Sequence, residues 1–287
     1  MQFAPMDGLR DPAVVIAFSG WNDAGNAATD LLRHLMDAYP GTDAGIIDDE
    51  RYWDYQQTRP MLHRTADGAW VEWPALRLRT VHHPDRDIIV VLGPEPNLLW
   101  RQFSMELVDR IKKIDPEIVV FLGAMLSDTP HSRPLPVGVY TSDPAVERKY
   151  SMDASDYTGP TGMIGVAAQL MLHERVPAAS LWVSVPHYVS SPPNPKAQDA
   201  LLTELEGVLH VQFQHAELPV EAQKWTTAVD QLSQQDPDIA EYIEQLEEAR
   251  DTEEVEGATG DTIAAELEKF LRRRGDDKPG NGNAIES

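Results

Sequence analysis

The chain of 287 residues contains no cysteine. Disulfide bonds, a thiol nucleophile and a cysteine-ligated zinc site are therefore excluded, which agrees with a reducing compartment. Long apolar runs are also missing, since no stretch approaches the roughly 20 residues that a helix needs to cross a bilayer. Only Arg10 precedes the first short apolar run, so the amino terminus lacks a signal-peptide pattern. We therefore expect a soluble cytoplasmic protein.

Basic residues are scarce. The sequence has 24 Lys and Arg against 47 Asp and Glu, a formal net charge of -23. This balance argues against nucleic acid and anionic membranes as partners, because binding to either depends on cations that neutralise phosphates. The acidic surplus is concentrated near the end, where residues 236–287 contain 16 acidic and 6 basic side chains. We expect protein partners for so acidic a surface.

The hydrophobic content of 42% is enough for one large domain with an addition. Four apolar runs rich in β-branched residues predict strands buried on both faces, and amphipathic helical patterns alternate with them. These runs are Ala13–Phe18, Asp87–Gly93, Glu117–Gly123 and Ser180–Val185. Their order predicts an α/β fold with a mainly parallel sheet flanked by helices. Asp67-Gly68 between two short alternating runs adds an antiparallel hairpin extension.

The strand patterns stop near Leu218. After that point, three narrow apolar stripes at helical spacing predict a C-terminal helical appendage, the last stripe running from Ile263 to Leu271. We therefore expect an α/β domain over residues 1–217, an acidic helical appendage over residues 218–274, and a disordered tail over residues 275–287.

The first buried strand runs into a turn, Gly20-Trp21-Asn22-Asp23-Ala24-Gly25-Asn26, that leads into the first helix. Asn22 or Asp23 is suited to cap that helix, and Gly20 and Gly25 permit a sharp turn. Such a turn is also where open α/β sheets bind ligands. However, no lysine follows as in a P-loop, the Gly-x-Gly-x-x-Gly spacing is absent, and Asp23 would repel a phosphate. We favour a structural turn and keep the floor of a ligand pocket as the alternative.

Unusual loops also follow the other predicted strands, and together with Gly20, Trp21, Asn22, Asp23 and Gly25 they make up the candidate pocket or interface. These loops contribute Glu95, Arg101, His131, Arg133, Gly159, Thr161, Gly162, His187 and Tyr188. Glu95, between two prolines, is placed to act as an acid or base, or to pair with Arg101; we slightly favour the ion pair. Asp128, His131 and Ser132 are too close in sequence for a serine-hydrolase relay. We assign no catalytic residue.

We expect no metal and no cofactor. Adjacent histidines on a strand point to opposite faces, so His82-His83 would chelate a metal poorly, and we expect a solvated turn there.

These motifs together resemble the PAC2 family, named for proteasome assembly chaperone 2, in its actinobacterial-type branch. The resemblance covers roughly residues 8–250. Its most specific part is the opening run Gly20–Ala28, and the others follow in the family's order: Glu95-Pro96 with Trp100-Arg101 and Phe103, Pro130–Pro134, Gly159–Gly162, Pro186–Tyr188 and Pro193–Pro195. The resemblance implies a phosphorylase/hydrolase-like α/β domain with a helical appendage, and a homo-oligomer, with a trimer suggested by fold analogy. It brings no general enzyme activity, and the chaperone role belongs to the eukaryotic members.

Two functions remain open from the sequence. The first is a non-catalytic protein-binding or assembly module, connected with the proteasome or another degradation system. The second is an enzyme acting on a small phosphorylated or nucleoside-like molecule at the strand-end loops. A solvent-filled cleft containing Asp23, Glu95, His131 and Arg133 would favour the enzyme; scattered or internally paired side chains would count against it.

Overall fold

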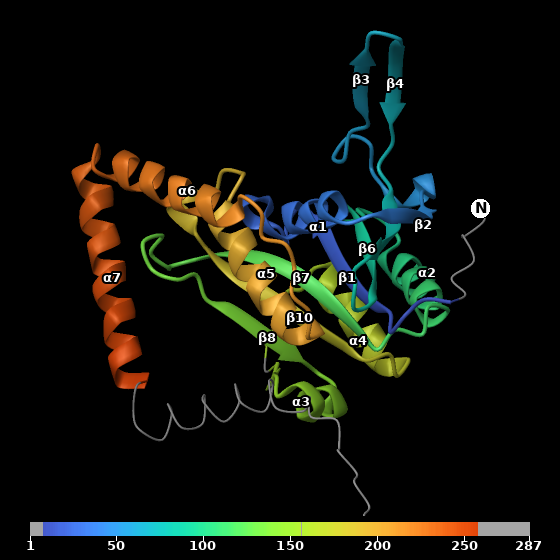
Figure 1. Ribbon diagram of the computed structural model, residues 1–287. Coiled ribbons are helices and arrows are strands. Elements are labelled where there is room, and N and C mark those ends of the chain that lie inside the picture. Colours follow the sequence, from blue (N-terminus) through green and yellow to red (C-terminus); the bar gives the residue numbers. More distant parts are fainter. Residues whose placement is uncertain (1–7, 156, 258–287) are drawn as a thin grey trace, which may run out of the picture.

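The computed structural model describes residues 8–155 and 157–257. Eight strands form one sheet in the order β2-β5-β6-β1-β7-β10-β8-β9 (Figure 1). Its strands are β1 (Ala13–Ser19), β2 (Gly41–Ile47), β5 (Leu76–His82), β6 (Asp87–Pro94), β7 (Ile118–Ser127), β8 (Val137–Thr141), β9 (Asp153–Ala154) and β10 (Ala178–Pro186). The four central strands β6, β1, β7 and β10 are parallel, whereas β5 and β8 pair antiparallel at either side of them. The predicted α/β fold with a mainly parallel sheet is confirmed.

Strand β1 lies at the centre because its side chains are apolar on both faces. Ala13, Val15 and Ala17 belong to one hydrophobic core, and the alternate residues from Val14 to Phe18 belong to the other. The first core is covered by α1 (Ala27–Ala38) and α5 (Pro195–Leu209), the second by α2 (Trp100–Lys112) and α4 (Met163–His173). An apolar run of this kind fits a strand only when helices cover both faces of the sheet.

The carboxyl half of the chain adds helices at one end of the sheet (Figure 1). Helix α6 (Leu218–Ser233) packs along α5, and its first residue Leu218 is buried in the first core. Helix α7 (Pro237–Gly257) contacts α6 and has one buried apolar side chain, Ile243, in its described part. The predicted helix at 263–271 and the tail at 275–287 lie outside the described residues. The division of the chain at residue 217 stays a prediction.

Shorter elements complete the fold. They are the 3-10 turns η1 (Ala24–Asn26), η2 (Glu50–Tyr52) and η3 (His187–Val189), helix α3 (Pro144–Tyr150), and the hairpin of β3 (Met61–Thr65) and β4 (Gly68–Glu72). This hairpin forms a separate two-stranded sheet, with Thr65 paired to Gly68 across the predicted turn, and it projects away from the rest of the molecule (Figure 1). None of the described helices is both long enough and apolar enough to span a membrane.

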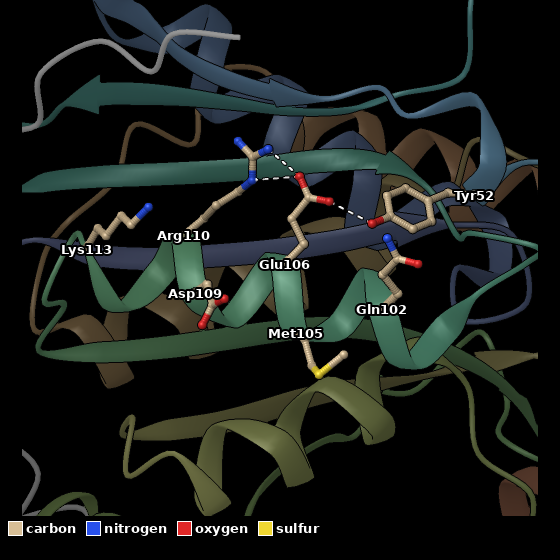
Figure 2. A pocket seen from close by; sticks show the side chains of 7 residues that line it. All are labelled: Tyr52, Gln102, Met105, Glu106, Asp109, Arg110 and Lys113. Carbon is tan, nitrogen blue, oxygen red and sulfur yellow. Dashed lines mark hydrogen bonds and ion pairs between the residues drawn. The ribbon is translucent and has the colours of Figure 1, made fainter.

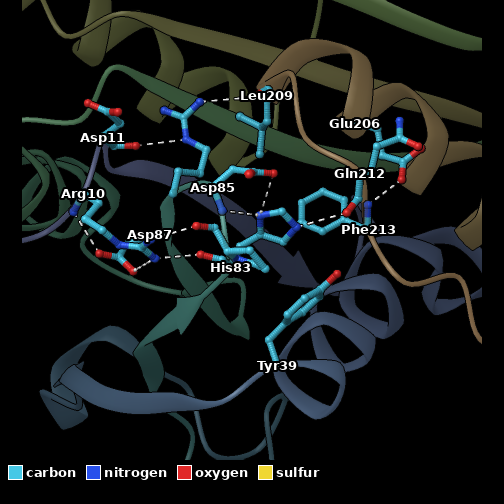
Figure 3. Close-up of polar contacts among 12 residues, drawn as sticks. Arg10, Asp11, Tyr39, His83, Asp85, Asp87, Glu206, Leu209, Gln212 and Phe213 are labelled. Atoms are coloured by element: carbon cyan, nitrogen blue, oxygen red, sulfur yellow. Dashed lines mark hydrogen bonds and ion pairs between the residues drawn. The ribbon is translucent and has the colours of Figure 1, made fainter.

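A buried polar network holds the amino ends of the strands (Figure 3). Contrary to the expected solvated turn, His83 is 3% exposed and its ring lies 5.1 Å from that of Tyr39 and 5.4 Å from that of Phe213. His82 is half-exposed and binds Asp87, with 2.9 Å between Nδ1 and Oδ1. Of this turn only His83 is buried, since Pro84 and Asp85 are exposed, and the backbone carbonyl of Gln212, which follows α5, accepts a hydrogen bond from His83 Nε2 at 3.0 Å.

Glu117 gives this network a dependence on pH. Burial raises the pKa of Glu117, but hydrogen bonds from Lys149 and Arg86 outweigh that effect and lower it to about 2. A lowered carboxyl pKa contributes stability that is complete above the unfolded value near 4.5 and is lost as the pH falls toward 2. As the pH falls from about 4.5 to about 2, the free energy of unfolding of Glu117→Gln should therefore decrease less than that of the wild type. Urea titrations across that pH range measure the difference. An unchanged pH dependence would contradict the assignment.

Candidate functional site

The turn after β1 is held by Asp23. Its carboxylate accepts hydrogen bonds from the backbone N–H of Ala28 at 2.8 Å and of Thr29 at 3.3 Å, and from the Thr29 hydroxyl at 2.5 Å. The first turn of α1 is thus satisfied by Asp23 rather than Asn22. Burial raises the pKa of Asp23 above 3.8, although these hydrogen bonds act in the opposite direction. A side chain that is 5% exposed and caps a helix is not available to a ligand.

The chain itself fills the crevice between β1 and β7. The connections that leave these neighbouring strands run in opposite directions, which is the position where open α/β sheets bind ligands. Here the chain continues past the end of β1 alongside β7: Ala124 donates a hydrogen bond to the Asn22 carbonyl at 2.8 Å, and Asp23 pairs with Ala124 as an isolated parallel bridge. The pairing is made possible by β7 and β10, which extend together to Ser127 and Pro186.

Glu95 joins this turn to the start of α4. Its Oε1 accepts hydrogen bonds from Asn22 Nδ2 at 2.9 Å and from the Met163 N–H at 2.6 Å. Gly162 lies directly beneath, where a Cβ would be 2.5 Å from Asn22 Oδ1 and 2.9 Å from Glu95 Oε1. The anion favoured at a helix amino terminus is therefore supplied by the protein's own carboxylate. Among the described contacts Glu95 forms no ion pair with Arg101, which is exposed, so the favoured interpretation of Glu95 was wrong.

We predict that Asn22→Asp destabilises the fold by about 2 kcal/mol, because it sets a second carboxylate against Glu95 where an amide now donates. Combining it with Glu95→Gln should recover most of the loss, since one amide then faces one carboxylate again. Urea denaturation of the two single variants and the double variant gives the coupling. Additive effects would contradict the assigned contact.

A second group of polar residues surrounds His131. His131 is 1% exposed, and its backbone N–H donates to the Tyr188 hydroxyl at 2.8 Å. The Tyr188 hydroxyl in turn donates its proton to His131 Nδ1, also at 2.8 Å. The ring proton of His131 is therefore on Nε2, which donates to Asp230 on α6 at 3.0 Å. Lys196, at the start of α5, donates to the His131 carbonyl at 2.5 Å.

The electrostatics of this group do not favour catalysis. A Tyr-His-Asp chain has the connectivity of a nucleophile relay. However, burial raises the pKa of Tyr188 to about 12, which disfavours the phenolate, and burial also lowers the pKa of His131 despite the opposing contact with Asp230. We conclude that the chain of hydrogen bonds fastens α6 to the loop after β7.

Helix α7 binds the same loop through charge. Arg133 donates to both carboxylate oxygens of Asp251 at 2.8 Å, and Ser132 donates to Glu247. Asp128 lies 3.2 Å from His187 Nδ1 and accepts a hydrogen bond from the Tyr242 hydroxyl at 3.2 Å. Side chains of the appendage thus bind the part of the predicted pocket that lies in the loop after β7.

The predicted site residues therefore fall into two groups with different partners. The first contains Gly20, Asn22, Asp23 and Gly25 of the turn together with Glu95 and Gly162, and the second contains His131, Arg133, His187 and Tyr188. Between the two groups no hydrogen bond or ion pair is found in the described part of the chain; they are linked through α5, where Asn194 binds the Gly25 carbonyl and Lys196 binds His131. Trp21, Arg101, Gly159 and Thr161 are exposed and lie outside both groups.

A hollow of the described surface lies elsewhere, along α2 (Figure 2). Its volume is about 500 Å³, and it is lined by Tyr52, Gln102, Met105, Glu106, Asp109, Arg110 and Lys113. Glu106 is already bound, to the Tyr52 hydroxyl at 2.7 Å and to Arg110. No group of three or more His, Asp or Glu side chains within residues 8–155 and 157–257 is placed to hold a metal ion.

Comparison with known proteins identifies the family. The PAC2 family model matches residues 17–233, which is most of the chain. The chain belongs to the PAC2 family. The matched span ends with α6, so the PAC2 region includes Asp230, the partner of His131, and stops before α7.

Solved structures give the same assignment. A PAC2 family protein from Streptomyces avermitilis is 43% identical, with a TM-score of 0.75, and the match covers 81% of this chain and 99% of that one. A proteasome-assembly chaperone homologue from Mycobacterium tuberculosis is 42% identical, with a TM-score of 0.73, covering 80% and 99%. An archaeal proteasome activator from Pyrococcus furiosus, at 13% identity, a TM-score of 0.60 and coverage of 78% and 94%, shares the fold alone. A comparison with curated proteins gives no match.

Sequence reasoning missed the acidic partners in this PAC2 chain: Asp230, Glu247 and Asp251. They lie about a hundred residues beyond the loop that they bind. The available signal was the excess of acidic residues after Asp236, in a chain where Arg133 is one of only 24 basic residues.

Proposed function

We propose that this PAC2 protein is a non-catalytic binding module that acts in the assembly or regulation of a proteasome or a related protein-degradation complex, and that it functions as a homo-oligomer. The observation that carries the proposal is that the chain itself fills the usual ligand position of the sheet. Asn22 and Asp23 occupy the crevice between β1 and β7, and Glu95 binds the amino terminus of α4. The relative from Mycobacterium tuberculosis, described as a proteasome-assembly chaperone homologue, supports the choice of partner.

The enzymatic alternative receives less support. Asp23, Glu95, His131 and Arg133 are each bonded within the protein, in two groups. A catalytic acid or base needs a free lone pair or proton facing substrate. The hollow along α2 does not contain any of these four side chains. A small molecule that binds to these four side chains would have to displace internal contacts.

Assembly of purified core-proteasome subunits, followed by native mass spectrometry with and without the intact protein, tests the proposal. We expect a complex with an assembly intermediate and faster formation of mature particles. A variant with Glu241, Glu244 and Glu248 changed to Gln tests the contribution of the exposed face of α7 without altering Glu247 or Asp251. If the intact protein binds no subunit or intermediate and leaves the assembly rate unchanged, the proposal fails.

A further inference from the structure

The β3–β4 hairpin with its flanking residues, 59–73, is called the arm below. It presents large apolar side chains to solvent: Met61, Leu62, Trp70, Val71 and Trp73 are 60%, 55%, 51%, 45% and 54% exposed. The register places Leu62 opposite Val71 on one face, while on the other His63 stacks on Trp70 with ring centroids 4.2 Å apart. A lone two-stranded hairpin is at best marginally stable in water, and exposed apolar clusters of this kind mark interaction sites. The arm therefore needs a partner surface.

The charges of the arm specify that surface. Arg59 and Arg64 are exposed, and neither is among the residues for which the described part of the chain provides an ion pair. Within the arm the sequence has two acidic residues, Asp67 and Glu72, beside these two arginines, and Glu72 is already paired with His63 and Arg77. A matching partner must combine apolar side chains with carboxylates that neutralise these arginines.

The end of α6 and the first half of α7 meet this description on the same chain. Leu232 and Ile239 are 62% and 39% exposed there, beside the exposed acids Asp238, Glu241 and Glu244. We call this surface, residues 232–244, the acidic corner. The hollow along α2 fits less well, because Arg110 and Lys113 lie within it beside its acids.

We propose that the arm of one copy of this protein docks on the acidic corner of a second copy. In Figure 1 the arm and α7 project at opposite ends of the molecule, so one chain cannot cover its own arm with its own corner. The contact is head-to-tail, which forms a closed ring when the rotation between copies closes. The proposal rests on the self-association included in the proposed function and gives it a surface; it does not depend on the proteasome link.

Sedimentation velocity of the full-length protein over a range of concentrations and salt tests the contact. We expect the wild type to self-associate, and less strongly as salt rises because the pairing is ionic. Reversal of the arm charges in Arg59→Glu/Arg64→Glu, or of the corner charges in Glu241→Arg/Glu244→Arg, should weaken association by about tenfold or more. Mixing the two variants should restore a complex, because each still has one intact half of a head-to-tail interface.

Arg101→Glu/Lys113→Glu is the matched control for the arm variant, since it lowers the net charge by the same amount at exposed positions of α2. It should associate like the wild type, and circular dichroism melts should show that all variants fold. If the wild type is an oligomer that the arm and corner variants leave intact, or if mixing restores nothing, the arm proposal is wrong and self-association stands. If the wild type is a monomer throughout, both are wrong.

Discussion

Replacing Arg86 by Met is expected to lower the free energy of unfolding by about 3 kcal/mol, the loss typical of removing one member of a buried charged contact. Arg86 is 7% exposed and donates to the carbonyls of Asp11 at 2.9 Å and Leu209 at 3.1 Å. It also pairs with Glu117 at 2.6 Å. Its guanidinium thus joins the segment before β1, the last carbonyls of α5 and the segment before β7. Met keeps much of the volume but removes the donor from the carbonyls of Asp11 and Leu209, while Glu117 keeps its contact with Lys149 at 2.9 Å.

The matched control for this substitution is Arg33→Met. Arg33 pairs with Asp30 within α1 at 2.6 Å, but its side chain is 50% exposed. Loss of an exposed ion pair changes stability by about 0.5 kcal/mol. Urea denaturation of both variants, with unchanged slopes, gives the comparison. Equal losses for Arg86 and Arg33 would show that the buried network contributes little.

Replacing Gly25 by Ala is expected to destabilise the protein by about 2–3 kcal/mol, because two independent penalties add. Gly25 has φ of 62°, in the left-handed region, and an added Cβ would lie 2.8 Å from the Cβ of Asn194. Asn194 cannot withdraw cheaply. Its backbone N–H donates to the Gly25 carbonyl at 3.1 Å, and its side chain caps α5 by accepting from the Ala197 N–H at 3.0 Å.

Two other glycines separate these penalties in the same thermal or urea melts. Gly68→Ala, at φ of 146° with open space around it, carries the backbone penalty alone. Gly207→Ala lies on the exposed side of α5 with no atom within 4 Å of the added Cβ, and should stabilise by about 0.5–1 kcal/mol. The expected order of stability is Gly207→Ala, wild type, Gly68→Ala, Gly25→Ala. If Gly25→Ala is as stable as Gly68→Ala or more stable, the turn between β1 and α1 is not packed closely on Asn194.

The internal contacts at the carboxyl ends of the strands favour binding over catalysis. The residue types of acid-base chemistry are present, yet each has an internal partner that fixes its proton or its charge: α1 for Asp23, α4 for Glu95, α6 for His131 and α7 for Arg133. These four contacts therefore join helices to loops. Exposed apolar side chains of the described surface include those of the arm and Trp21, which is 70% exposed.

The sequence by itself determined the class of fold and the family. The apolar run Ala13–Phe18 favours a strand buried on both faces because it is short and rich in β-branched residues, and the alternation of four such runs with amphipathic helices favours helices on both sides of the sheet. The hairpin was equally local, since a two-residue turn of Ala66 and Asp67, followed by Gly68, connects its strands. The order of the loop motifs was enough to indicate the PAC2 family.

The pairing of the loops was decided by tertiary structure alone. Glu95 was expected to bind Arg101, six residues away, but it binds Asn22 and Met163, because the parallel strands bring their carboxyl ends to one edge. His83 was expected in a solvated turn but is buried by Phe213 and Tyr39. His131 was a free candidate until α6 placed Asp230 beside it. Periodicity and turn chemistry act over a few residues, whereas the partners of a charged or polar side chain are set by contacts between segments far apart in the chain.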